Sequence, residues 1–372
     1  MNNKVTLIIT GVLVGMLAVL LVKLGNPPNM GVCIACFLRD ISGALGLHQA
    51  NTAQYIRPEI LGLALGAFAT SVVTKDFRVW GGSSTFTRFV LGFFVMIGML
   101  VFLGCPLRLI FRLSAGDLNA LAGLLGLIAG VALGAVFLRK GFTLGQAVTQ
   151  NKTNGYIFPA IILAFLILLL TAPAFIFFSA QGPGSMHAPL IISLGAGIII
   201  GVLAQRSRLC LIGGIRDFIL FKEFYMLYGF LAILFAAMAG NLLMGSFKLG
   251  FVDQPIAHND GIWNFLGMAL SGFGSVLLGG CPLRQLISAS EGNTDSAATV
   301  TGLLTGAAFA HNFGLAASAK GVPVAGQTAV IIGFVVVIWI AFFNIFLKIK
   351  SQVSQGVIDN DGNKGHKGAS LS

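Results

Sequence analysis

The sequence predicts an all-α integral membrane protein built from two related halves. Three observations lead to this prediction. Hydrophobic residues make up 56% of the 372 residues and charged residues 9%, which is far from the composition of soluble globular domains. Long apolar runs, separated by short polar segments, recur along the chain. The pentapeptide Gly-Cys-Pro-Leu-Arg occurs twice, at residues 104–108 and 280–284.

Ten apolar runs are candidate transmembrane helices, because a hydrocarbon core of roughly 30 Å needs about 20 apolar residues per helix. Several runs are short or interrupted by glycine, so we expect nine or ten crossings, some of them partial. In the fourth run, Gly126, Gly130 and Gly134 are spaced four residues apart, which predicts a close-packing helix face. The runs begin near Val5, Ile60, Phe89, Leu118, Tyr156, Leu190, Phe224, Trp263, Ala297 and Gln327.

The basic residues lie between the apolar runs and predict the orientation of the chain. The formal net charge is +11, but no basic stripe or nucleic-acid motif accompanies it, so nucleic acid is not an expected partner. If the N-terminus is cytoplasmic and all ten runs cross, most Lys and Arg, including Lys75, Arg139 and Lys348, face the cytoplasm. We therefore expect a multi-pass protein in a lipid bilayer, with both termini cytoplasmic.

The duplication extends beyond the pentapeptide. In each half a cysteine is followed six residues later by Arg-Asp, and the cysteine of the pentapeptide follows 72 residues after that first cysteine in one half and 71 in the other. The cysteine, the Arg-Asp pair and the pentapeptide recur in the same order and with nearly the same spacing in both halves, which indicates an internal repeat. The matched residues are Cys33, Arg39, Asp40, Cys105 and Arg108 in the first half and Cys210, Arg216, Asp217, Cys281 and Arg284 in the second.

Each half holds five apolar runs, so the second copy is predicted to be inverted relative to the first. Equivalent segments of inverted repeats meet near the bilayer midplane, and interrupted helices there commonly line a substrate path. We expect short re-entrant helices to meet at the centre. The predicted units are repeat 1 over residues 1–179, repeat 2 over 180–350, and a disordered cytoplasmic tail over 351–372, where the composition turns polar and glycine-rich.

The pentapeptide predicts a short helix beginning at Pro106 and another at Pro282, because proline is tolerated at the first helical position. Cys105 and Cys281 would then stand at the positive end of a helix, where free N–H groups can receive an anion. The alternative is that the cysteines are small core residues and the arginines reach for the interface.

Four of the five cysteines occupy repeat-equivalent positions with an arginine within six residues, which favours a substrate path. For Arg39 and Arg216 the simplest role is pairing with the neighbouring aspartate, and direct anion contact is the alternative. Cys36 aligns with Gly213 in the second half, and the sequence leaves two roles open for it, packing in the core and contact with the substrate. The predicted path residues are Cys33, Cys105, Cys210, Cys281, Arg39, Arg108, Arg216 and Arg284.

Several chemistries are excluded or disfavoured. The sequence contains no Walker motif, and the glycines at 195, 197 and 201 have the wrong spacing for a dinucleotide loop. The single C-x-x-C, Cys33 and Cys36, lacks the partners of a metal site. No ordered nucleophile, base and orienting group stands out. We therefore expect neither an enzyme nor a cofactor or metal.

The stretches "RSRLCLIGGIRDF", "GCPLRLIFRLSAGDLNA" and "GGCPLRQLISASEGNTDSAATVTGLLTGAAFAHNFGLA" resemble the YeeE/YedE sulphur-transport family, in particular its YedE branch of selenium transporters. The resemblance covers roughly residues 5–347. It implies a bacterial inner-membrane protein that takes up thiosulfate between two pseudo-symmetric halves, past a few cysteines. By motif these are Cys33, Cys105 and Cys281, with Cys210 as the repeat partner of Cys33.

The residues and the resemblance together suggest that neutral thiols at helix N-termini donate weak hydrogen bonds to a soft sulphur or selenium anion. Two alternatives stay open. One is a membrane thiol-disulfide oxidoreductase acting through Cys33 and Cys36. The other is a scaffold for a cytoplasmic sulphur- or selenium-carrier protein.

Overall fold

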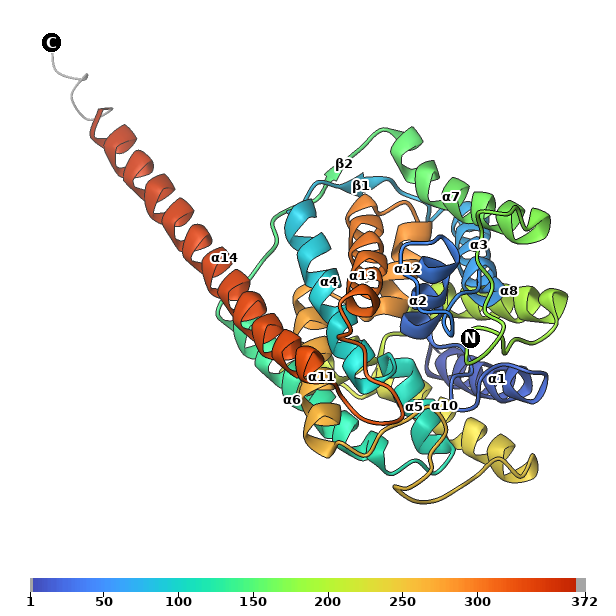
Figure 1. Cartoon of the computed structure of the whole chain (residues 1–372). Helices are drawn as coiled ribbons and strands as arrows, with labels where there is room; N and C mark the ends of the chain where they lie inside the picture. The colour runs from blue at the N-terminus through green and yellow to red at the C-terminus, as the bar shows by residue number, and fades with distance from the viewer. Residues whose placement is uncertain (1–2, 366–372) are drawn as a thin grey trace, which may run out of the picture.

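The computed structural model describes residues 3–365, and the side chains of residues 4–346 within them. Across this part of the chain the fold is helical apart from one small antiparallel pair of strands, as Figure 1 shows. The elements are α1 (Asn3–Lys23), α2 (Ile34–Ala44), α3 (Pro58–Val73), β1 (Trp80–Gly81), α4 (Thr85–Phe102), α5 (Pro106–Ser114), α6 (Asn119–Arg139), β2 (Val148–Thr149), α7 (Lys152–Thr171), α8 (Leu190–Ser207), α9 (Leu211–Phe221), α10 (Tyr225–Leu243), α11 (Gly261–Leu277), α12 (Pro282–Ser290), α13 (Thr294–Asn312) and α14 (Val324–Gly365).

The prediction of an all-α integral membrane protein is confirmed. Each of the ten apolar runs forms a helix, and within the described residues eight helical segments are long and apolar enough to cross a membrane. This number is smaller than the predicted nine or ten for a physical reason. Helix α3 has 16 residues, too few for a bilayer unless protein surrounds it, and α13 carries threonines, an aspartate and a histidine that lower its hydropathy.

In the part of the chain that the structure describes, four helices are shorter than α3 and too short to cross. Helices α5 and α12 have 9 residues each and begin at Pro106 and Pro282, as predicted, and α2 and α9 have 11 each. Since a helix rises about 1.5 Å per residue, these are roughly half a hydrocarbon core long. A residue with positive φ interrupts the helix immediately before each pentapeptide: Leu103 (φ 63°) in the first half and Gly279 (φ 84°) in the second. This left-handed turn separates each short helix from the long helix before it.

Helices at equivalent places in the two halves pack against exchanged partners. Helix α6 packs on α11, and its counterpart α13 packs on α4; α1 packs on α10, and its counterpart α8 packs on α3. The loops follow the same rule, because Asp117 bridges Gly250 and the equivalent Asn293 bridges Trp80. This exchange is the packing that two interlocked repeats produce. The inverted orientation of one repeat in a membrane stays a prediction.

The glycine pattern of α6 allows a close helix contact, as predicted. A Cβ atom added to Gly126 would lie 2.0 Å from the carbonyl oxygen of Phe265, and one added to Gly130 would lie 2.0 Å from that of Ala269. Both partners belong to α11. Glycine at these places lets the two backbones touch, which no residue with a side chain permits.

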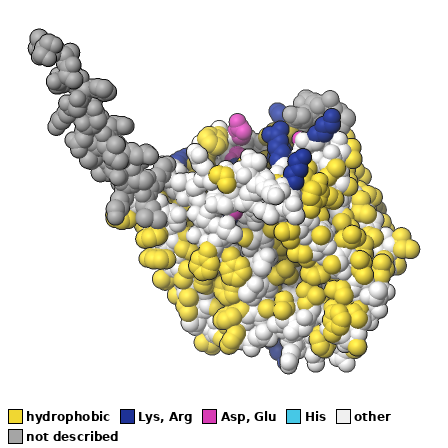
Figure 2. All heavy atoms as spheres, turned by 90° about the horizontal axis from the view of Figure 1, so that it is seen from above, with side chains coloured by type: hydrophobic (Ala, Val, Ile, Leu, Met, Phe, Trp, Pro, Cys, Tyr) yellow, Lys and Arg dark blue, Asp and Glu magenta, His cyan; other side chains and the backbone are white. Residues whose placement is uncertain are grey.

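The disordered tail predicted over residues 351–372 stays a prediction. Residues 351–365, expected to be disordered, continue α14 as helix to Gly365, and residues 366–372 lie outside the described part. No proline follows Pro323, so every later residue retains its backbone N–H for helical hydrogen bonding. Figure 1 shows this helix extending away from the other helices. In Figure 2, hydrophobic side chains are distributed widely over the drawn face, and most of the visible Lys and Arg lie along its upper edge, a pattern expected of a membrane protein.

Candidate functional site

The four repeat-equivalent cysteines share one structural position. Cys33, Cys105, Cys210 and Cys281 are the N-caps of α2, α5, α9 and α12, the four short helices. In α5 and α12 the proline after the cysteine fixes the first helical residue, and the cysteine itself is extended. All four side chains are at most 5% exposed. The duplicated motif therefore builds four buried helix N-termini, each with a thiol.

Two cysteines of each half lie together. The Sγ atoms of Cys33 and Cys105 are 3.8 Å apart, and the Cys281 backbone N–H donates to Cys210 Sγ at 3.4 Å. Cys33 Sγ also accepts from the Cys36 N–H, as Cys210 Sγ does from the Gly213 N–H, each at 3.3 Å. These are capping hydrogen bonds that orient the sulfur. The equivalent geometry in both halves follows from the shared sequence.

The two pentapeptides meet at a small central cavity. Its lining includes Cys105, Pro106 and Leu107 from one motif and Cys281, Pro282 and Leu283 from the other. Leu211 of α9 and Phe230 of α10 complete the wall. The cavity has room for roughly one water molecule. Neither Cys105 nor Cys281 caps its own helix with its side chain, so both thiols can form a hydrogen bond to a small molecule or ion in this cavity.

The N-termini of α5 and α12 both border this cavity, and those of α2 and α9 join it through the cysteine pairs. An α-helix N-terminus carries roughly half a positive charge. The site is therefore electropositive even before its side chains are considered. Such an arrangement can hold an anion and disfavours a cation.

Arg108 adds a full charge beside the first cysteine pair. Its side chain is fully buried and donates from Nη1 to Cys36 Sγ at 3.3 Å and to the Leu103 carbonyl, as well as from Nε to the Asn29 carbonyl at 3.2 Å. Nη2 donates to the Ile256 carbonyl at 3.1 Å. Among the described side chains no carboxylate pairs with this guanidinium. Its charge is thus offset by dipoles alone.

Arg284, the repeat counterpart, is different. Its Nη2 lies 2.9 Å from Glu291 Oε2, and both side chains are partly exposed. Seven residues after Arg108 the chain has Ala115, where the second half has Glu291 after Arg284. The sequence difference explains why one arginine is paired with a carboxylate and the other is not.

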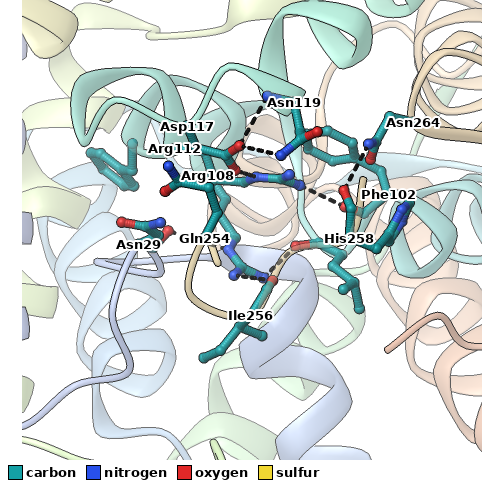
Figure 3. Close-up of polar contacts among 12 residues, drawn as sticks. Asn29, Phe102, Arg108, Arg112, Asp117, Asn119, Gln254, Ile256, His258 and Asn264 are labelled. Carbon is teal, nitrogen blue, oxygen red and sulfur yellow. Dashed lines mark hydrogen bonds and ion pairs between the residues drawn. The ribbon is translucent and has the colours of Figure 1, made fainter. Parts of the chain in front are cut away.

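Figure 3 shows the polar network beyond Arg108. Arg112 Nε lies 2.6 Å from Asp117 Oδ2, and Asp117 also accepts from the backbone and side-chain amides of Asn119. Arg112 Nη1 donates to the Phe102 carbonyl at 2.8 Å. The network ties the C-terminal end of α5 to the start of α6. It fixes the short helix that carries Arg108.

Asp40 is the centre of a second ion cluster. Arg39 lies 2.6 Å from one of its oxygens and Arg57 2.6 Å from the other, with all three side chains buried. In the second half Arg216 lies 2.7 Å from Asp217, and both are partly exposed. The Arg-Asp segments therefore make the internal ion pairs that were the simpler of the two predicted roles. Arg39 and Arg216 order their helices, and neither lines the central cavity.

Several residues of the site have no signal in the repeat pattern. Cys36 contacts Arg108, Arg57 completes the Asp40 cluster, and Arg112 holds α5. Arg112 stands four residues after Arg108, one helical turn away, which is the signal that could have found it. The carbonyl groups that receive Arg108 belong to distant loops and leave no mark in the sequence.

His258 belongs to the loop before α11 and borders the same network. It is buried; Nε2 lies 2.8 Å from the Val101 carbonyl, and Nδ1 accepts from the Asp260 N–H at 3.3 Å. One donor and one acceptor describe a neutral imidazole protonated at Nε2. Burial, and then the charge of Arg112, lowers the pKa of His258 below its ordinary value. Within residues 4–346, no three His, Cys, Asp or Glu side chains are arranged to hold a metal ion.

Comparison with known proteins finds sequence similarity over part of the chain. A family model described as sulphur transport matches residues 206–356, which include Cys210, the second pentapeptide and Arg284. The second half of the chain is thus similar to the sulphur transport family over these residues. The resemblance to YeeE/YedE proteins is thereby confirmed at the level of the family, and membership of the selenium branch stays a prediction.

Two curated relatives are similar to part of the chain. The thiosulfate transporter TsuA of Escherichia coli (strain K12) is 29% identical over 107 residues, 29% of this chain and 30% of that protein. The thiosulfate transporter TsuA of Spirochaeta thermophila is 30% identical over 98 residues, 26% of this chain and 29% of that protein. The chain thus aligns with less than a third of the length of either relative.

Proposed function

We propose that the chain is a transporter of the bacterial inner membrane that takes up a small sulphur- or selenium-containing anion, thiosulfate or a similar species. The observation that carries the proposal is the meeting of Cys105 and Cys281, from two copies of one motif, at a buried electropositive cavity. The sulphur transport family match and the names of the two relatives support the class of substrate.

The mechanism follows from the chemistry of the four thiols. A protonated thiol is a weak hydrogen-bond donor, suited to the soft, polarisable sulfur or selenium of the guest. Helix N-termini offset the guest's negative charge without binding it as tightly as a cluster of unpaired arginines would. A chain of weak contacts suits passage, because a guest must enter and also leave. The guest would move from one cysteine pair across the cavity to the other.

The four arginines of the path have unequal roles in this mechanism. Arg108 is the one that supplies charge to the guest, since no carboxylate neutralises it. Arg39, Arg216 and Arg284 are held by Asp40, Asp217 and Glu291 and keep the short helices in place. They shape the path and contribute a weaker field.

The arrangement in the membrane is part of the proposal. Residues 1–179 and 180–350 are the two inverted repeats, and both termini face the cytoplasm, as the positive-inside rule favours. A sulphur- or selenium-carrier protein at that face is a partner that would remove the guest after uptake. The exchanged helix packing of the two halves supports the repeat.

The test is uptake of labelled thiosulfate, and separately of labelled selenite, by cells that lack their other importers. The intact chain is compared with Cys105→Ser and Cys281→Ser, and with alanine at the same positions. Serine retains a hydrogen-bond donor and alanine does not, so a hydrogen-bonding path predicts graded loss, with alanine worse than serine. The amount of chain inserted in the membrane is measured for each variant.

The outcomes separate the three hypotheses. Thiol-disulfide chemistry through Cys33 and Cys36 requires their sulfur, so an oxidoreductase would lose its activity equally when Cys33 or Cys36 is replaced by serine or by alanine. A scaffold would lose nothing with any of the four variants. Absence of uptake of both substrates by the intact, inserted chain would refute transport of these compounds.

A further inference from the structure

A second, larger cavity opens beside the path and carries no polar side chain apart from one tyrosine. This lateral pocket lies between α5, α6, α9 and α10 and includes Ile110, Ile128, Leu211, Phe218, Phe230 and Leu231. Its volume is about 430 Å³, within the roughly 300–1,000 Å³ of small-molecule sites. All fourteen residues that line it are aliphatic or aromatic. Water would find almost no hydrogen-bond partners in this pocket, so the pocket suits an apolar molecule.

The rim of the lateral pocket faces outward. Ile128 of α6 is 39% exposed, and Leu231 and Phe224 beside it are 47% and 51% exposed. Helices α6 and α10 are both apolar enough to cross a membrane. Exposed aliphatic and aromatic side chains on such helices meet lipid. The pocket therefore opens toward the acyl chains of the bilayer.

Basic side chains surround one end of the lateral pocket. The Lys222 ammonium lies 5.3 Å from the ring centre of Phe218, and the Lys4 ammonium lies 5.9 Å from that of Tyr228. Arg139 donates to the Ile219 carbonyl at 3.3 Å. Phe218, Ile219 and Tyr228 all line the pocket. Three basic residues, brought from three separate places in the sequence, thus touch the lining at this end.

One acidic residue follows in this loop. Glu223 is exposed next to Lys222, so the excess charge at the mouth is smaller than three. Arg216 and Asp217 nearby neutralise one another. The balance at the mouth remains positive. An occupant with an apolar body and an anionic end matches both the pocket and its rim.

We propose that the lateral pocket binds one acyl chain of an anionic phospholipid, whose headgroup is held by Lys222, Arg139 and Lys4. Clusters of Lys and Arg at the cytoplasmic ends of transmembrane helices attract anionic lipid, and these three residues fall on the predicted cytoplasmic side. Snorkelling side chains above an apolar groove provide the geometry for such a lipid. A zwitterionic lipid has the chain but lacks the net charge.

The lateral pocket shares a wall with the central cavity. Leu211 and Phe230 line both spaces. An acyl chain on one side of these two side chains supports them from behind and keeps them against the cysteines. Lipid binding would therefore stabilise the closed form of the path. The binding itself does not depend on the proposed transport, and the test below reads binding alone.

The test uses quenching of tryptophan fluorescence by lipids with brominated acyl chains. In the full chain Trp80, Trp263 and Trp339 are replaced by phenylalanine, and Tyr228→Trp places one reporter at the pocket. A matched control chain keeps Trp339, 63% exposed on α14, as its reporter and retains Tyr228. Each chain is reconstituted in vesicles of phosphatidylcholine with increasing brominated phosphatidylglycerol, or the reverse. The quenching curves give the relative affinity of each reporter site for the two lipids.

A preference for phosphatidylglycerol of about five-fold or more is expected at the pocket reporter, because one basic residue near the surface attracts an anionic lipid by about that factor. The control reporter should show little preference. Lys222→Gln with Arg139→Gln should bring the pocket preference close to one, while Glu223→Gln should keep or increase it. Equal quenching by the two lipids at the pocket reporter would overturn the proposal.

A second variant tests the acyl chain separately from the headgroup. Leu231→Phe adds bulk at the rim and should reduce quenching of the pocket reporter by both brominated lipids. Unchanged quenching would mean that the chain lies elsewhere and would refute the pocket as its site. Elution of each variant as a single species in detergent shows that it is folded, so loss of quenching is not mistaken for unfolding.

Discussion

Arg108 provides the most discriminating test of the electrostatics of the path. Replacing it by glutamine removes a fully buried charge that has no carboxylate partner among the described residues. Glutamine keeps two hydrogen-bond donors for the three carbonyls that Arg108 serves. The variant therefore separates the charge of the side chain from most of its hydrogen bonding.

The expected effect on folding is small. An unpaired buried acceptor costs about 1–3 kcal/mol, and Arg108→Gln leaves one of the carbonyls of Asn29, Leu103 and Ile256 unsatisfied. Against this, the folded variant no longer bears the desolvation cost of a buried guanidinium, and this stabilises the variant by a similar amount. The two terms oppose each other, so the variant should fold and insert.

The expected effect on the guest is large. Nη1 of Arg108 lies 3.3 Å from Cys36 Sγ, and the Cys36 N–H lies 3.3 Å from Cys33 Sγ, so a guest at Cys33 would be near the guanidinium. At a separation of about 6 Å and an effective dielectric constant of about 20, a unit charge contributes about 3 kcal/mol. This corresponds to about 100-fold in the dissociation constant.

The assay is the concentration dependence of thiosulfate uptake, with equal amounts of inserted protein. Arg108→Gln should raise KM by about 100-fold, Arg108→Lys should restore much of the loss through its charge, and Arg284→Gln should change KM far less because Glu291 already neutralises Arg284. An unchanged KM in Arg108→Gln, or a larger effect from Arg284→Gln, would show that the unpaired charge does not act on the guest.

Two further predictions concern the stability of the fold. Because burial and Arg112 lower the pKa of His258, the folded chain keeps it neutral while the unfolded chain protonates it; stability is fully present above the ordinary value of 6.5 and falls as the pH decreases below it. Thermal unfolding in detergent at pH 7.5 and 5.5 should show this loss, and His258→Gln should reduce it, the remainder belonging in part to His48, whose pKa burial also lowers. Gly130→Ala should destabilise the chain by about 1–3 kcal/mol, because its Cβ would meet the Ala269 carbonyl at 2.0 Å. Gly195→Ala, with no atom within 4 Å of the added Cβ, should be neutral or slightly stabilising, and similar unfolding temperatures for the two variants would contradict the packing argument.

The sequence predicted those parts of the site that depend on local chemistry. Pro106 and Pro282 start short helices because proline requires no N–H donor partner there, and this holds whatever surrounds them. The glycines of α6 likewise predicted a close contact, although not that the partner is α11. Spacing along one helix is visible in a sequence, and the identity of a distant neighbour is not.

The parts that escaped prediction depend on contacts between distant segments. Arg108 donates hydrogen bonds to the backbone carbonyls at positions 29 and 256. Because every residue type has a backbone carbonyl, the sequence gives no signal for these contacts. Arg57 meets Asp40 across 17 residues and a loop, where a pairing rule based on neighbours finds only Arg39.

The difference between the two arginines of the repeated motif has a consequence for the relative affinities of the two proposed cysteine sites. The cysteine pairs are arranged alike in the two halves, yet Ala115 leaves Arg108 unpaired where Glu291 neutralises Arg284. If both pairs bind the same anion, the Cys33–Cys105 pair holds it more tightly than the Cys210–Cys281 pair. A symmetric duplication would have produced two equal sites, between which a guest has no reason to distribute unevenly. If the proposed path is correct, this one sequence difference makes the first pair the tighter of the two sites.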